Sequence, residues 1–227
     1  LSDETKEDIN WKLVNFREAE ISSTFNVNVV DWSELGNSRA ARSKYKTLDW
    51  SDVDYSQISE ETKEGINWRN VSFSQAERSS TFNLNVVDWS ELGNSRAARS
   101  QYKTIDWSDV DYGNLSDETK EDINWRNVDF KEAIRSNTFT VNAVDWVELG
   151  NSRASRSKYK TIDWSDIDYG NLSDETKDGI NWRNVSFSEA TRSSTFNVNA
   201  VDWSELGNSR STKTSYGIVD WSDVDYT

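Results

Sequence analysis

The stretch that decides the fold reads Ile66-Asn67-Trp68-Arg69-Asn70-Val71-Ser72-Phe73-Ser74-Gln75-Ala76. An aliphatic residue lies two positions before the tryptophan, and another lies three positions after it. The same arrangement surrounds all twelve tryptophans of the 227-residue chain. The chain is therefore one small motif copied many times, rather than a domain built around a single site.

The spacing of the tryptophans defines the larger repeat. From Trp11 to Trp221, successive tryptophans are 21, 18 and 18 residues apart, and then the cycle begins again. Each copy in such an array contacts mainly its neighbours, so we expect one continuous array instead of separate globular domains. One cycle covers 57 residues, which divides the chain into the repeats 1–57, 58–114, 115–171 and 172–227.

Within each third of a repeat the apolar positions recur in steps of five. On a single helix such positions scatter around the cylinder, so no apolar stripe forms. Each triplet of an aliphatic residue, any residue and a large residue is followed by two polar residues, as in Val71-Ser72-Phe73-Ser74-Gln75. This order is typical of a short extended segment followed by a corner. The pattern predicts a chain that turns every five residues.

Residues 66–80 resemble the pentapeptide-repeat family, and the resemblance covers about fifteen residues of each 18- or 21-residue coil. It implies a right-handed, four-sided β-helix with one small or aliphatic residue and one large residue pointing inward on each side. We therefore expect an all-β fold, a β-solenoid of about twelve coils with three coils in each repeat. The alternatives are a four-bladed β-propeller and an α/β solenoid like that of leucine-rich repeats.

Two short segments carry local signals of their own. Phe82, Leu84 and Val86 alternate with polar residues, which predicts a strand. Ser116 precedes the acidic run of residues 117–122, which predicts a capped turn of helix. The tryptophans follow Asp or Asn beside the aliphatic positions, so we expect stacked core residues; the alternative is an exposed aromatic ladder for sugar rings.

The composition excludes several classes of chemistry. The chain has no Cys and no His, which removes disulfides, thiolate nucleophiles, imidazole bases and most zinc or copper sites. Pairs of aspartates recur in every repeat, whereas a catalytic site needs distinct environments for its acid and its base. We therefore expect no enzymatic activity and no cofactor.

Calcium is the one metal that the sequence leaves open. Aspartates two positions apart supply hard oxygen ligands near turn residues, although solvated turns explain the same pairs. The candidate ligands are Asp52, Asp54, Asp109, Asp111, Asp166 and Asp168.

Charge limits the partners. A net charge of −14 opposes binding to nucleic acid and to anionic lipid, and no stretch is apolar enough for insertion into a membrane. Acidic and basic thirds alternate along the chain, so we expect opposite charges to face each other between neighbouring coils.

These observations predict a structural or adhesive repeat rod of a surface or filament-forming protein, extracellular or at the cell surface. Its partners would be neighbouring repeats or further copies of the same protein. Association end to end is expected because the sequence begins and ends in phase without atypical coils. The alternative is a binding module, either a carbohydrate-binding array or an acidic rod that imitates DNA, as the resemblance implies.

Overall fold

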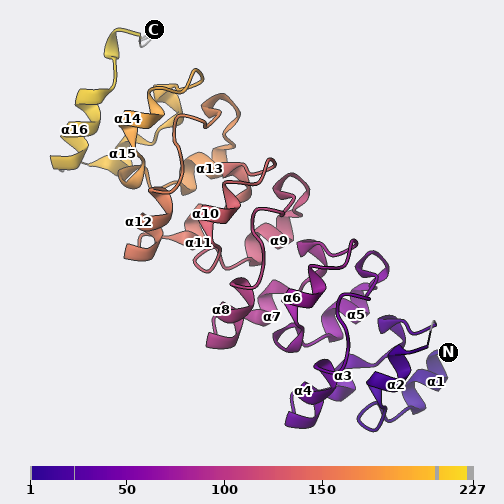
Figure 1. The fold of residues 1–227 in the computed structure, drawn as a ribbon. Coiled ribbons are helices and arrows are strands. Elements are labelled where there is room, and N and C mark those ends of the chain that lie inside the picture. The colour runs from indigo at the N-terminus through magenta and orange to yellow at the C-terminus, as the bar shows by residue number, and fades with distance from the viewer. Residues whose placement is uncertain (1, 23, 208–209, 224–227) are drawn as a thin grey trace. The chain divides into compact units, whose positions relative to one another are not determined.

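The chain folds as a succession of short helices (Figure 1). The computed structural model describes residues 2–22, 24–207 and 210–223, and no strand occurs among them. The expected all-β fold and β-solenoid are therefore wrong, and the resemblance to the pentapeptide-repeat family is not supported. The β-propeller and the α/β solenoid fail for the same reason, because both require strands.

The step of five has a different physical basis from the one predicted. In the second repeat, Trp68–Asn70 form one turn of 3-10 helix (η3), and Phe73–Ala76 form the next helix (α6). Val71 and Ser72 between them are extended, with ψ angles of 140° and 96°. One pentad is thus a helical turn and an extended link. Each link redirects the chain, so the apolar positions need not form the stripe of one continuous helix.

The same elements recur at intervals of 57 residues. The first set of helices is acidic: α1 (Asp3–Asp8), α5 (Glu60–Gly65), α9 (Asp117–Asp122) and α13 (Asp174–Gly179). The second set begins at phenylalanine: α2 (Phe16–Glu20), α6, α10 (Phe130–Ala133) and α14 (Phe187–Ala190), with η3 and η8 (Trp182–Asn184) before α6 and α14.

The second half of each repeat continues with four further kinds of segment. Single 3-10 turns come first: η1 (Val27–Val29), η4 (Leu84–Val86), η6 (Val141–Ala143) and η9 (Val198–Ala200). Short helices that begin at tryptophan follow: α3 (Trp32–Leu35), α7 (Trp89–Leu92), α11 (Trp146–Leu149) and α15 (Trp203–Leu206). Basic helices come next: α4 (Arg39–Tyr45), α8 (Arg96–Tyr102), α12 (Arg153–Tyr159) and α16 (Arg210–Ile218). The last turns are η2 (Tyr55–Gln57), η5 (Tyr112–Asn114), η7 (Tyr169–Asn171) and η10 (Trp221–Asp223).

Side-chain caps start many of these short helices, although α2, α6 and α14 have none. The predicted helix after Ser116 is confirmed: it is α9, and the Ser116 hydroxyl accepts a hydrogen bond from the Thr119 N–H at 3.1 Å. Such caps matter because the first N–H groups of a helix have no partner within it. The predicted strand at residues 82–86 is wrong. Its second half is η4, capped by the Asn83 side chain, which accepts from the Asn85 N–H at 2.7 Å.

Glycine ends the helices that begin at tryptophan. Helix α7 stops at Leu92, and Gly93 has a φ of 59° and a ψ of −152°. This conformation is open to glycine and strained for other residues. The chain can therefore change direction within three residues and begin α8 at Arg96.

The tryptophans form the core, as predicted. Trp50, Trp68 and Trp164 are 0% exposed, and only Trp203 and Trp221 are half-buried among the tryptophans. The indole N–H donates to the carbonyl of the residue five positions earlier, at 2.8–3.0 Å, and this carbonyl belongs to the helix before the tryptophan. This bond is made by Trp11, Trp32, Trp50, Trp68, Trp89, Trp146, Trp164, Trp182, Trp203 and Trp221.

The rings also contact one another. In the first repeat the ring centroid of Trp32 lies 5.7 Å from Phe16 and 5.9 Å from Trp50. These contacts belong to a compact unit made of residues 1–106 and 115–123, called unit 1 below. Residues 107–114 and 124–227 make up unit 2, which has equivalent contacts such as Trp146 with Trp164 at 6.3 Å.

Side chains carry the hydrogen bonds between successive turns of the chain. Outside the helices, the backbone–backbone hydrogen bonds of the described residues join positions three or four apart. Longer connections use a side chain on one turn and the backbone of another. The Thr81 hydroxyl accepts from the Tyr55 N–H at 2.8 Å, and the Ser79 hydroxyl donates to the Val53 carbonyl at 2.8 Å. Asn28 is bidentate: it donates to the Gln57 carbonyl and accepts from the Ser59 N–H.

The indole bond predicts a specific sensitivity to substitution. Trp68→Phe should lower the free energy of unfolding by about 2–4 kcal/mol, because the buried Lys63 carbonyl loses its donor and a small cavity remains. Trp221→Phe should cost less than about 1 kcal/mol, because Trp221 is half-buried and water can replace the indole at the Tyr216 carbonyl. Urea unfolding followed by circular dichroism measures both. Equal losses would contradict this account of the core.

Candidate functional site

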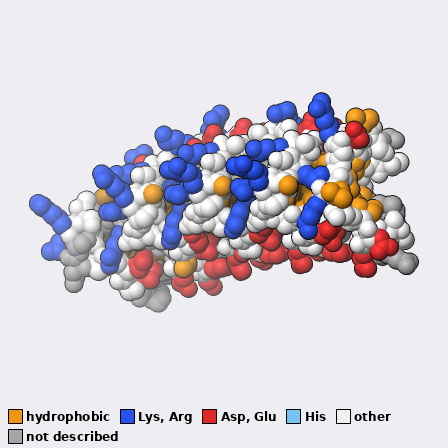
Figure 2. Space-filling model, turned by 90° about the horizontal axis from the view of Figure 1, so that it is seen from below, with side chains coloured by type: hydrophobic (Ala, Val, Ile, Leu, Met, Phe, Trp, Pro, Cys, Tyr) orange, Lys and Arg blue, Asp and Glu red, His pale blue; other side chains and the backbone are white. Residues whose placement is uncertain are grey.

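Each unit carries its exposed basic side chains and its exposed acidic side chains on different helices. In unit 1, α4 and α8 carry exposed arginines, whereas α5 and α9 carry exposed acids. Figure 1 shows α4 and α8 on one side of this unit and α5 and α9 on the other. Figure 2 shows basic and acidic side chains gathered in separate patches of the visible face. Opposite charges meet between turns at some places, as in Lys63 with Glu118 at 3.8 Å, but most of the charged side chains lie on separate basic and acidic surfaces.

The basic helices leave their guanidinium groups without carboxylate partners. Among the described residues, no carboxylate lies within 4.0 Å of Arg39, Arg42, Arg96 or Arg99. In unit 2, Arg153, Arg156 and Lys160 of α12 and the following turn meet Arg183 around a cavity of about 480 Å³. Arg183 is held there because its Nε donates to the Glu205 carbonyl at 2.6 Å. This arrangement favours contact with carboxylate or other oxyanion groups.

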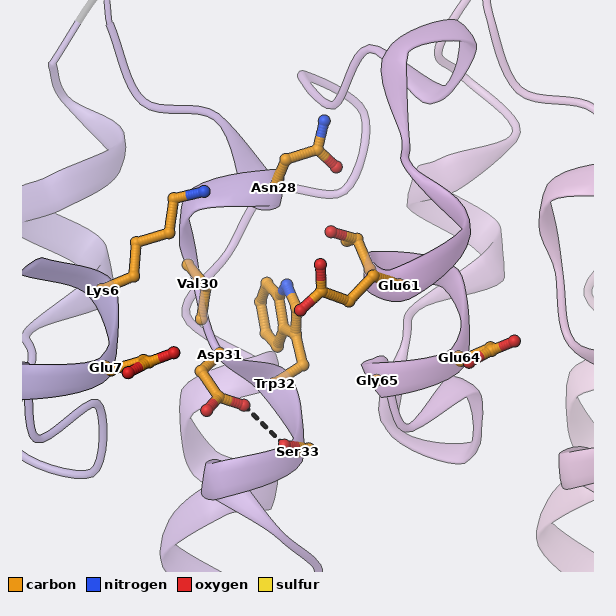
Figure 3. A pocket seen from close by; sticks show the side chains of 11 residues that line it. Lys6, Glu7, Asn28, Val30, Asp31, Trp32, Ser33, Glu61, Glu64 and Gly65 are labelled. Atoms are coloured by element: carbon orange, nitrogen blue, oxygen red, sulfur yellow. Dashed lines mark hydrogen bonds between the residues drawn. The ribbon is translucent and has the colours of Figure 1, made fainter. Parts of the chain in front are cut away.

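The acidic side of unit 1 contains an open cavity of about 490 Å³ between α1 and α5 (Figure 3). Glu7 and Lys6 line it from α1, and Glu61 approaches from α5. Trp32 forms the floor, and Asp31 lies beside it. The Asp31 carboxylate accepts from the Ser33 hydroxyl at 2.6 Å, which lowers the pKa of Asp31 below its usual value. Asp31 is thus committed to capping α3, and the remaining carboxylates are solvated.

The calcium candidates lie in exposed turns and are largely used as caps. The Asp54 carboxylate accepts from the Ser56 N–H and hydroxyl, at 3.1 and 2.6 Å. Asp111 accepts from the Asn114 side chain, and Asp168 accepts from Gly170 and Asn171. The first aspartate of each pair is exposed to solvent: Asp52, Asp109 and Asp166.

A cavity of about 320 Å³ brings Asp52 and Asp54 near Asp49 and Glu20. Besides Asp54, two of these carboxylates already accept hydrogen bonds. Asp49 accepts from the Ser51 hydroxyl at 2.6 Å, and Glu20 accepts from the Asp49 N–H at 2.5 Å. Within the described ranges, no three acidic groups are arranged so that they could hold a metal ion. This geometry favours the interpretation of the aspartate pairs as solvated, capped turns.

Two half-buried charges were not found by the sequence analysis. Glu91 accepts from the Trp68 N–H at 3.1 Å, and burial raises its pKa above the usual value for glutamate. Lys158 donates to the Val128 carbonyl, and its ammonium lies 4.8 Å from the centre of the Phe130 ring. Burial lowers the pKa of Lys158 to about 8. Two features of the sequence mark these positions. A glutamate lies two residues after the tryptophan of each WSEL or WVEL segment, and a long polar side chain recurs at the equivalent positions Lys44, Gln101 and Lys158.

Comparisons of the chain with models of protein families, with curated proteins and with solved structures found no match. Of the helices in the described part of the chain, none has the length and apolar character needed to cross a bilayer.

Lys158 predicts a dependence of stability on alkaline pH. Its pKa is about 8 in the folded chain, and the usual pKa of a lysine is about 10.4. Between these values the unfolded chain binds more protons, so this lysine makes stability rise with pH. Lys158→Gln should remove that rise and add about 1–3 kcal/mol at pH 7, because Gln101 makes the equivalent bond to the Val71 carbonyl at 2.6 Å.

The control for this prediction is Lys160→Gln, which changes an exposed lysine on the same segment. Urea unfolding at pH 7 and at pH 10 measures the difference between each variant and the wild type. A difference for Lys158→Gln that does not change with pH would contradict the effect of burial.

The capping role of Asp54 is separable from metal binding. Asp54→Ala should lower the free energy of unfolding by about 1 kcal/mol, whereas Asp54→Asn should be nearly neutral because asparagine caps equally well. The melting temperature of the wild type should not change with millimolar calcium. A rise with calcium that Asp54→Asn abolishes would instead assign a calcium ligand.

Proposed function

We propose that this chain is a structural repeat array of a surface or filament-forming protein, and that it associates with further copies of itself without enzymatic activity. The observation that supports this most is that the same hydroxyl groups hold neighbouring turns together in successive repeats. The hydroxyl groups of Thr81, Thr138 and Thr195 accept from a tyrosine N–H in three successive repeats, at 2.8–2.9 Å. Groups used in this way are not available to act on a substrate.

The position of the aromatic side chains gives the carbohydrate alternative less support. Binding of sugar rings through stacking needs exposed aromatic faces, but most of the indoles lie at 4% exposure or less. Their N–H groups are bonded to carbonyls of the same chain. An acidic DNA mimic also has less support, because the exposed arginines of α4, α8 and α12 give each unit a basic surface as well as an acidic one, whereas DNA is negatively charged along its whole length.

Sedimentation velocity over about a hundredfold range of protein concentration tests the proposal. The expected result is an average sedimentation coefficient that rises with concentration, at physiological ionic strength and pH 7. A sedimentation coefficient that stays at the value of the monomer throughout would overturn the proposal. Circular dichroism of the same samples shows that the chain remains folded.

A further inference from the structure

We infer that copies of this chain bind each other side by side, with the basic helices of one copy against the acidic helices of another. The inference rests on the proposed self-association and adds the surfaces that carry it. Both surfaces are present within unit 1, where α4 and α8 supply the arginines and α5 and α9 supply the acids.

The basic surface is formed by exposed arginines that pair with no carboxylate of the residues described in the structure. Arg39 and Arg42 lie on α4, and Arg96 and Arg99 occupy the same positions on α8. In the described part of the chain these guanidinium groups contact no carboxylate. Guanidinium is suited to intermolecular ion pairs, because its planar set of donors binds a carboxylate with two parallel hydrogen bonds.

The acidic surface is formed by glutamates that remain unpaired after the local lysines are satisfied. Lys63 lies 3.9 Å from Glu60 and 3.8 Å from Glu118, and Lys120 lies 2.9 Å from Asp117. Among the residues that the structure describes, three exposed glutamates belong to none of these pairs: Glu61, Glu64 and Glu121. The lysines of this surface are thus already engaged, and its outermost charges are negative.

The two surfaces share one period. Helices α4 and α8 begin 57 residues apart, at Arg39 and Arg96, and α5 and α9 belong to the same pair of repeats. Two copies that match at one basic helix and one acidic helix can therefore match at the next pair without a change of register. A single exposed ion pair contributes little, so the repetition is what makes the contact effective.

The net charge of −14 does not prevent such a contact. At physiological ionic strength, charges farther apart than about 8 Å are largely screened, whereas groups in direct contact are not. Local complementarity therefore outweighs the mutual repulsion of two acidic chains. A free polyanion lacks the fixed spacing of the acidic helices, so a second copy of the chain matches the spacing of the basic helices better.

A charge-swap experiment tests the inference. The first variant combines Arg39→Glu, Arg42→Glu, Arg96→Glu and Arg99→Glu, and the second combines Glu61→Lys, Glu64→Lys and Glu121→Lys. Each variant alone presents one sign of charge on both surfaces and should associate at least tenfold more weakly than the wild type. An equimolar mixture of the two should associate again, and about 0.5 M salt should weaken that association.

The matched control places the same change of charge on other helices. Arg17→Glu, Arg78→Glu, Lys131→Glu and Arg135→Glu lie on or next to α2, α6 and α10, and should leave association close to that of the wild type. A second control replaces the four arginines of α4 and α8 by lysine, which keeps the charge. Circular dichroism and melting temperatures confirm that each variant is folded.

The outcomes separate this inference from the proposed function. Wild-type association that both charge-reversed variants retain would overturn the inference and leave the proposed self-association in place. A folded wild type that stays monomeric would overturn both. Binding of a sulfated polysaccharide to α4 and α8 by a monomeric wild type would assign the basic surface to a free polyanion, and would likewise overturn the inference. Loss of association in each variant with recovery in the mixture supports it.

Discussion

A buried indole must bond its N–H inside the protein, and the rest of this structure depends on how the tryptophans meet that requirement. Each bonded indole donates to the carbonyl five residues before it, as Trp68 does to Lys63 at 2.8 Å. This carbonyl belongs to a helix that is too short to satisfy its own terminal groups. One side chain therefore fills the core, closes the preceding helix and fixes where the next turn begins. The motif can be copied because all three tasks are local.

The second constraint is that, over the ranges the structure describes, successive turns share no strand ladder. Their hydrogen bonds instead run from a side chain on one turn to the backbone of another, as from Ser79 to Val53 and from Gln101 to Val71. Each such bond needs a side chain of a given length and donor type at a given position. This explains physically why the four repeats are so similar in sequence. Gln101 and Lys158 occupy equivalent positions, and each reaches the equivalent carbonyl of its own repeat, Val71 or Val128.

Charge is left for the surface because the interior is built from aromatic, aliphatic and hydroxyl groups. The charged residues of α5 are mainly acids, whereas those of α4 are all bases, although both helices follow a serine cap. Within unit 1, α4 and α8 lie on one side and α5 and α9 lie on the other, so the two sides of this unit have opposite charge. The order of these helices in the sequence predicts that acidic and basic layers alternate along one stack. Only the fold shows that the acids and bases point away from each other.

The sequence predicts the 57-residue repeat, the buried tryptophans and the helix after Ser116, because periodicity, the apolar pattern and capping residues can be read from short segments. It could not distinguish an extended segment with a corner from a helical turn with an extended link, since both place apolar groups five residues apart. The tertiary structure decided this, because bonds such as Trp68 to Lys63 and Trp68 to Glu91 stabilise helical turns where a β-solenoid would need paired strands. It likewise decided that Asp54 is a cap, because its carboxylate lies against Ser56.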